Sequence, residues 1–137
     1  MMHVEVTERK IDVEQAMARL GKVDSGAVVV FSGAVRPWEG KDRIEKLHYE
    51  HYPEMATKRM GEIVAESVEK WKLTDATVLH RVGDVPAGEL SVVVAVSSER
   101  RKNAFGGCAE IIERIKQEVP IWKKDIGERT QWQSERK

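Results

Sequence analysis

The stretch ATVLHRVGDVPAGELSVVVAVSS, from Ala76 to Ser98, decides the fold. Its two ends, Ala76–Val85 and Glu89–Ser98, are rich in β-branched residues, and the segment Pro86-Ala87-Gly88 between them is a turn signal. We therefore predict two strands joined as a hairpin. Because the second strand is apolar at most positions, we expect helices from the rest of the chain to cover the sheet.

Working outward, three more strands are predicted. His3–Glu8 alternates between apolar and polar residues, as a half-buried strand does. Gly26–Val35 is too short and too β-branched to be anything but a buried strand, and Ile44–Tyr52 follows it after a loop at Arg36–Arg43. The segments on either side of Gly127 are predicted to form a terminal ribbon.

Three helices are expected to cover these strands. The first begins at Asp12, which can cap it with Gln15, and ends at Gly21. The second runs from Pro53 to about Lys72, and the third spans Asn103–Val119 and stops at Pro120. The inward stripe of the third helix is predicted to hold Ala104, Phe105, Cys108, Ile111, Ile112 and Ile115. The fold class is therefore α+β (mixed α/β): one domain over residues 1–137 with an antiparallel sheet and about three helices.

Composition limits the classes of function. The chain has 137 residues, and 23 basic residues balance 23 acidic ones, which argues against a protein that wraps nucleic acid. A charged content of 34% without a long apolar run argues against a membrane span. Residues 1–20 do not resemble a signal peptide, and the single cysteine, Cys108, fits a reducing compartment. We expect a cytoplasmic protein that binds neither nucleic acid nor a membrane.

The histidines and the cysteine give little sign of a metal or a nucleophile. His48 and His51 are three residues apart on a predicted strand, so their side chains point to opposite faces. No other histidine has ligands at metal-binding spacing, and we expect no metal. Cys108 lies on an apolar helix face and is interpreted as a small buried hydrophobe. Gly106 and Gly107 indicate a close approach to the backbone, by a neighbouring strand or by a ligand.

Basic residues are more informative. Arg100, Arg101 and Lys102 lie between a buried strand and the start of a helix. A helix N-terminus attracts anions, so cations gathered there favour a bound anion unless acidic neighbours compensate. Arg36 directly follows another buried strand, and the ends of strands are where sites are usually built. The alternative is that each of these residues is a solvated surface charge.

The stretch RIKQEVPIWKKD, Arg114 to Asp125, raises the same question for two lysines. Lys116 flanks the apolar stripe of the third helix, and Lys123 alternates with Ile121 after Pro120. A lysine beside apolar neighbours can act as an acid, a base or an amine nucleophile. It can equally pair its charge with a phosphate or a carboxylate. The spacing alone leaves open whether the two lysines share a site.

Six ordered blocks carry a resemblance to a known family. They are FSGAVR (31–36), YEHYPEM (49–55), LHRVGDVPAGE (79–89), VSSERRKNAF (96–105), KQEVPIWKKD (116–125) and WQSER (132–136). In this order and spacing they resemble the MoaE family, the large catalytic subunits of molybdopterin synthase. The resemblance is nearly full-length, and the third and fifth blocks are especially characteristic.

The resemblance implies an α/β hammerhead fold and a sulfurtransferase. Family members convert cyclic pyranopterin monophosphate (precursor Z) into molybdopterin by installing its dithiolene sulfurs. The sulfur arrives as a thiocarboxylate on the C-terminal Gly-Gly tail of a small ubiquitin-like MoaD-type subunit. Two large subunits form the homodimer core of a heterotetramer, and no cofactor is implied. Because this chain has no C-terminal Gly-Gly, we expect its sulfur donor to be a separate chain.

The resemblance also assigns site residues. Lys116 and Lys123 match the two catalytic lysines, Phe31 matches a pocket position, and the anion-binding arginines correspond to Arg36, Arg100, Arg101 and Arg136. Arg100 stands where many members have histidine, and an arginine cannot shuttle protons because it stays charged. Two other functions remain open: a non-catalytic adaptor for a ubiquitin-like partner, and a binder of nucleic acid or acidic protein.

Overall fold

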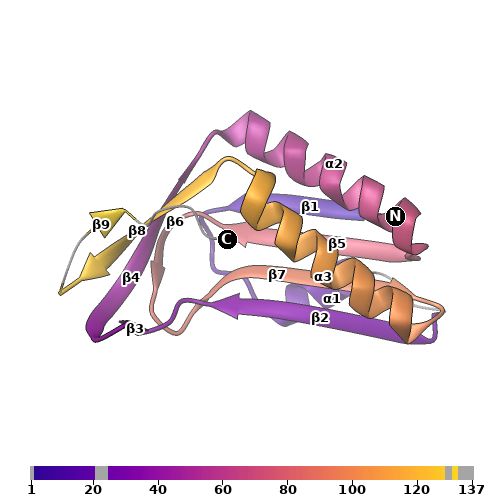
Figure 1. Cartoon of the computed structure of the whole chain (residues 1–137), viewed down its shortest axis with the longest axis horizontal. Helices are drawn as coiled ribbons and strands as arrows, with labels where there is room; N and C mark the ends of the chain where they lie inside the picture. The colour runs from indigo at the N-terminus through magenta and orange to yellow at the C-terminus, as the bar shows by residue number, and fades with distance from the viewer. Residues whose placement is uncertain (1, 21–24, 129–130, 133–137) are drawn as a thin grey trace.

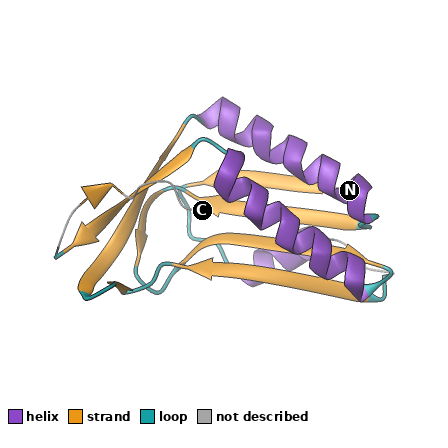
Figure 2. Ribbon diagram, in the orientation of Figure 1, coloured by secondary structure: helices purple, strands orange, loops and turns teal. Residues whose placement is uncertain are grey.

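Two β-sheets meet along the chain, one of four long strands and one of five strands of uneven length, and helices pack on the first, which holds more residues and is called the larger sheet (Figure 2). The computed structural model describes residues 2–20, 25–128 and 131–132. In chain order the elements are β1 (Met2–Thr7), α1 (Val13–Arg19), β2 (Ala27–Ala34), β3 (Trp38–Glu39), β4 (Asp42–His51), α2 (Pro53–Trp71), β5 (Asp75–Arg81), β6 (Gly83–Pro86), β7 (Leu90–Ser98), α3 (Arg101–Glu118), β8 (Ile121–Gly127) and β9 (Gln131–Trp132).

The larger sheet has the strand order β1-β5-β7-β2 (Figure 1). Strands β5 and β7 pair antiparallel, and β2 pairs antiparallel with β7. The antiparallel pairs agree with the predicted antiparallel sheet, and strand β1, which lies parallel to β5, makes the sheet mixed. Its inner strand β7 is buried on both faces from Ser91 to Ser98, which explains why its sequence is apolar at most positions instead of alternating.

Helices cover both faces of this sheet. Helices α2 and α3 lie side by side on one face, and α1 lies on the other (Figure 1). The main core lies between the sheet and the α2–α3 pair, and its largest fully buried side chains include Met60, Ile63 and Ile111. A smaller cluster lies under α1 and includes Ile11, Leu79 and Val93. The smaller sheet, with order β3-β4-β8-β9 and with β6 also paired to β4, projects from one end.

The predicted hairpin is correct in its pairing and wrong in its connection. Asp75 to His80 pair with Ser97 to Val92, as a hairpin requires. However, β5 ends at Arg81, and Gly83 adopts a left-handed φ of 79°, which redirects the chain. Strand β6 then leaves the larger sheet and pairs with β4. The predicted strand Ala76–Val85 is therefore two strands that belong to different sheets.

Strand β2 is half-buried, where the sequence predicted a fully buried strand. It lies at the outer edge of the larger sheet, and Val28 keeps 38% of its surface exposed. Helix α1 contacts β5 and β7, so one face of β2 is left without helical cover. The opposite face carries Phe31, which packs against the main core.

Helix α3 begins at Arg101, two residues before the predicted Asn103, and its apolar stripe differs from the prediction at Phe105. Its buried residues are Ala104, Gly107, Cys108, Ile111 and Ile115. The prediction for Phe105 is wrong, because this side chain lies off that stripe and is 61% exposed. The two glycines face the end of α2 and the start of β5. A Cβ at Gly106 would overlap the Trp71 ring, and one at Gly107 would press on Leu73.

Several local predictions are confirmed. Asp12 and Gln15 form a capping box, in which the Gln15 N–H donates to Asp12 Oδ1 at 2.8 Å. Pro53 begins α2, and β8 pairs with β9 as the terminal ribbon. The predicted helix end at Gly21 lies outside the described residues. Within the described ranges, no helix combines the length and the apolar character that crossing a membrane requires.

Candidate active site

A cavity of about 830 Å³ opens where the two sheets and the C-terminal end of α3 meet. This volume lies within the range of roughly 300–1,000 Å³ that is typical of small-molecule sites. Its walls come from β2 and the loop after it, from β4, β7 and β8, and from the last turns of α3. The residues that line it are therefore far apart in the sequence and are brought together only by the fold.

A tight corner between α3 and β8 brings the two lysines to this cavity. Helix α3 ends at Glu118, the backbone of its C-cap residue Val119 is extended, and Pro120 prevents the helix from continuing. The Tyr52 N–H donates to the Pro120 carbonyl oxygen at 3.3 Å, which ties the corner to β4. Lys116 lies on the last turn of α3. Lys123 lies on β8, where it pairs with Tyr49 of β4. Both lysines line the cavity. The question that their spacing left open is thus settled: they share one pocket.

Arg36 and Phe31 reach the cavity from β2. The end of β2 is held by two backbone hydrogen bonds, from Val35 N–H to the Glu89 oxygen at 2.9 Å and from Gly88 N–H to the Val35 oxygen at 2.8 Å. Arg36 follows directly and lines the cavity. One of its guanidinium nitrogens, Nη2, lies 3.6 Å from Glu39 Oε1. Both side chains are well exposed, so this pair is weak and an arriving anion can displace it.

Two of the predicted site residues, Arg100 and Arg101, do not line this cavity. Arg100 precedes α3 as its N-cap residue and Arg101 is the first residue of the helix, and both are exposed. Lys116 follows Arg101 by 15 residues, and a helix rises 1.5 Å per residue, so about 22 Å separate them. Arg136 lies outside the described residues. A single chain therefore brings together Phe31, Arg36, Lys116 and Lys123, but not Arg100 and Arg101.

His80 is a cavity residue that the sequence reasoning did not select. It lies near the end of β5 and is 8% exposed, and its ring meets that of Tyr49 edge-on at 5.4 Å. Its Nδ1 lies 2.9 Å from the Arg81 carbonyl oxygen, which can only accept, so Nδ1 carries the hydrogen. Burial is the main reason that the pKa of His80 falls to about 4, and the positive charges of His51 and Lys123 lower it further. A signal was available in the sequence, since His80 comes near the end of a buried strand.

Cys108 has the role that its position predicts. It is buried, and its thiol lies 3.8 Å from the Val94 carbonyl oxygen. Burial raises the pKa of the thiol to about 11, so the reactive thiolate is scarce at neutral pH. The side chain therefore packs in the core and is not a nucleophile.

This fold and this cavity define a two-sheet α+β protein with a cavity lined by two lysines and an arginine. The family model described as MoaE protein matches residues 6–118, and the chain belongs to the MoaE family. A relative from Bacillus subtilis, named molybdopterin synthase catalytic subunit, is 43% identical over 128 residues, which cover 93% of this chain and 82% of the relative.

Solved structures agree in fold. The crystal structure of molybdopterin synthase from Staphylococcus aureus matches with a TM-score of 0.88 and 40% identity, covering 95% of this chain and 96% of the other. A complex of subunits 1 and 2 of molybdopterin-converting factor from Helicobacter pylori contains a chain that is 24% identical, with a TM-score of 0.72 and coverage of 98% and 91%. This second likeness concerns the fold alone. The predicted fold class is confirmed.

Proposed function

We propose that this chain is the catalytic subunit of a molybdopterin synthase and acts as a sulfurtransferase. It would transfer sulfur to cyclic pyranopterin monophosphate from a thiocarboxylated small subunit. The observation that carries the proposal is the convergence of Lys116, Lys123 and Arg36 around one cavity, from α3, β8 and the end of β2. Relatives with 43% identity are named for the same enzyme.

The two lysines take different parts in this proposal. Lys123 lies beside the carbonyl of the donor tail and polarises it, so that the carbon–sulfur bond breaks more readily. Lys116 assists at the pterin side chain, where the new carbon–sulfur bond forms as a carbon–oxygen bond of the cyclic phosphate breaks and leaves a terminal phosphate. Both reactants are anions, and fixed positive charge in a partly enclosed site reduces their mutual repulsion. Water replaces the sulfur on the tail, which is left as a carboxylate.

Arginines hold the phosphate in this proposal. Arg36 can present two parallel N–H groups to a phosphate, a geometry that lysine lacks. Arg100 and Arg101 lie about 22 Å from Lys116 along α3, so they can complete the same site only from a second copy of the chain. We therefore place these two arginines across the interface of a homodimer, the core of a heterotetramer.

The partner is a small ubiquitin-like subunit of the MoaD type. Its extended C-terminal tail would enter the cavity beside Ile121 and Trp122, which line the opening next to Lys123. Trp122 remains 46% exposed and stacks edge-on against Tyr52 at 4.9 Å, so an apolar surface is available at this mouth. Glycines at the end of the tail suit a narrow passage because they have no side chain.

The test is incubation of the purified chain with precursor Z and a thiocarboxylated small subunit, with the dithiolene product as readout. Lys116→Ala and Lys123→Ala should each lower product formation by about 100-fold or more, since each removes a charge at the reacting atoms. Both variants should still bind the small subunit, which gel filtration measures.

Lys124→Ala is the matched control. Lys124 neighbours Lys123 on β8, but successive side chains of a strand point to opposite faces and Lys124 does not line the cavity. Its activity should stay near that of the parental chain. Parental rates in both Lys116→Ala and Lys123→Ala would refute the assignment. Partner binding without any product from the parental chain would instead favour the non-catalytic adaptor.

A further inference from the structure

The charges that line the cavity do not by themselves favour an anion. Three cations, Arg36, Lys116 and Lys123, are matched by three carboxylates, Glu39, Glu118 and Asp125. A site for two anionic reactants with no formal excess of positive charge would attract them poorly. The surroundings of the carboxylates therefore decide how the cavity acts, and Glu118 binds two arginines.

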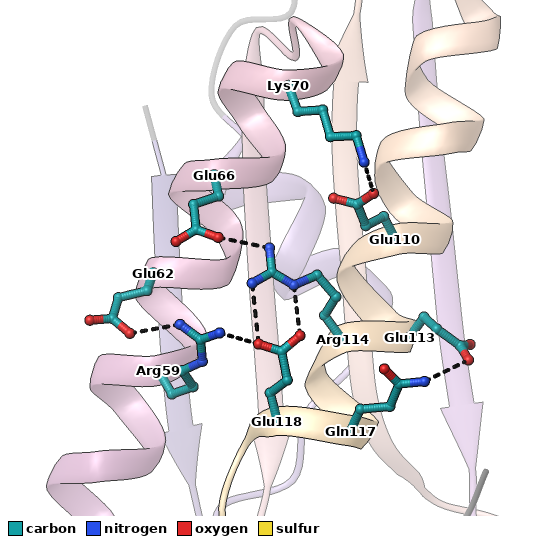
Figure 3. Close-up of polar contacts among 9 residues, drawn as sticks. All are labelled: Arg59, Glu62, Glu66, Lys70, Glu110, Glu113, Arg114, Gln117 and Glu118. Carbon is teal, nitrogen blue, oxygen red and sulfur yellow. Dashed lines mark hydrogen bonds and ion pairs between the residues drawn. The ribbon is translucent and has the colours of Figure 1, made fainter.

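Glu118 is the last residue of α3, and two arginines bind its carboxylate (Figure 3). Arg114 donates from Nε to Oε2 at 2.8 Å and from Nη2 to Oε1 at 3.2 Å, which is a bidentate pair. Arg59 donates to the same carboxylate from α2. The side chains of Arg59, Arg114 and Glu118 keep 33%, 21% and 29% of their surface exposed, so solvent screens the cluster only partly.

The two arginines lie outside the cavity, since neither belongs to its lining. Arg114 also reaches Glu66 of α2 at 2.9 Å, and together with the Arg59–Glu118 pair this contact links α2 to α3 (Figure 3). Within α2, Arg59 also reaches Glu62 at 2.9 Å. Arg114, more than Arg59, holds the pKa of Glu118 at about 2. The carboxylate is therefore ionised at any physiological pH, and only its partners can offset its charge.

We propose that Arg59 and Arg114, whose other partners Glu62 and Glu66 are more exposed than Glu118, offset the field of the Glu118 carboxylate from outside the cavity, so that it opposes Lys116 and Lys123 less when anionic reactants bind. The proposal deepens the proposed function and rests on it for the identity of those reactants. Arg59 and Arg114 are positioning residues, because they act through Glu118 and do not touch the substrate. Lys116 and Glu118 are two positions apart on the helix and do not face each other, so Glu118 acts through its field.

A simpler role for this cluster would be to hold α2 against α3. The two roles differ in what they predict for Glu118→Gln. If the cluster only joins the helices, removing the charge of Glu118 should weaken anion binding as much as removing Arg59 does. If the arginines serve to neutralise Glu118, the glutamine variant should bind anions at least as well as the parental chain, because the opposing charge is gone.

Four variants separate these outcomes: Arg59→Met, Glu118→Gln, the double variant, and Lys70→Met as the control. Lys70 binds Glu110 at 2.6 Å and also joins α2 to α3 (Figure 3), but Glu110 does not line this cavity. Lys70→Met therefore removes the same charge from the same helix pair. Two quantities are measured: the KM for precursor Z with a thiocarboxylated small subunit, and the Kd for inorganic phosphate without partner, from tryptophan fluorescence.

Arg59→Met should raise both the KM for precursor Z and the Kd for phosphate about fivefold, because it removes one partly screened positive charge. Glu118→Gln should leave them at or below the parental values, and the double variant should return to within about twofold of the parental chain. Lys70→Met should change neither. A Glu118→Gln variant as weak as Arg59→Met, or a double variant without recovery, overturns the proposal. A parental chain that forms no product refutes the proposed function, whereas the phosphate affinities still test the electrostatics.

Discussion

Replacing Gly107 with alanine adds one methyl group to the inner face of α3. The new Cβ would lie 2.8 Å from Leu73 Cδ2 and 2.9 Å from Leu73 Cδ1. Carbon atoms in contact normally lie about 3.5–4.0 Å apart. Leu73 is 7% exposed and packs in the main core, so it has little room to move away.

Two opposing effects set the size of the change. Alanine favours a helix over glycine by about 1 kcal/mol, and overpacking a core costs about 1–3 kcal/mol. Gly107→Ala should therefore lower the free energy of unfolding by about 0–2 kcal/mol. Gly61 supplies the control, because it lies inside α2 with no atom within 4 Å of an added Cβ. Gly61→Ala should raise the free energy of unfolding by about 1 kcal/mol, or Tm by about 4 °C.

Urea unfolding followed by circular dichroism, at one protein concentration, measures both variants. Helix propensity cancels in the comparison, so the difference between the two, about 1–3 kcal/mol, isolates the overlap with Leu73. If Gly107→Ala stabilises the chain as much as Gly61→Ala does, the reasoning about close packing at this helix face is wrong.

Two further predictions concern buried titratable groups. The pKa of His80 is lowered from 6.5 to about 4, so as the pH falls through this window the unfolded chain takes up a proton that the folded chain refuses. The free energy of unfolding should therefore drop by up to about 3 kcal/mol across it. In urea titrations at several pH values, the free energy of unfolding of a His80→Asn variant should depend less on pH than that of the parental chain. The same pH dependence in both proteins would contradict the lowered pKa of His80. Cys108, whose thiol pKa is raised to about 11, should react with a disulfide reagent at pH 7 only after denaturation. Rapid reaction of the folded chain would show that the thiol is accessible.

Local chemistry made most of the secondary structure predictable. The Asp12 capping box and the start of α2 at Pro53 depend on residues within a few positions of each other, and both are confirmed. The end of α3 before Pro120 follows from the missing N–H of proline, and it is also confirmed. In such cases the physical cause lies within one turn of backbone.

Features that depend on distant segments could not be predicted in this way. The sequence around Gly83 does not reveal that β6 would leave β5 and pair with β4, because the partner strand lies more than 30 residues away. Apolar content also could not show that β2 is an edge strand, since α1 covers its neighbours and not β2.

The candidate site illustrates the same division. Lys116 and Lys123 are close in sequence, so their shared pocket depends on one corner of the chain. Arg36 lines that pocket because the larger sheet places the end of β2 there. In the sequence, only the family resemblance connected Arg36 with the lysines. Arg100 and Arg101 lie at the other end of α3, where no pattern within one chain could decide their role. His80 lines the cavity because β5 brings its ring against that of Tyr49 from β4, and this contact exists only in the folded chain.

The corner at Val119 and Pro120 has a mechanical consequence. Only two residues separate α3 from β8, so a movement of α3 along its axis also moves β8 and the smaller sheet. The backbone positions of Lys116 and Lys123 are therefore coupled to each other by this short connection. The opposite wall, where Arg36 follows an edge strand, is held instead by backbone hydrogen bonds at Val35 and Pro37, which join it to the turn before β7 and to β4.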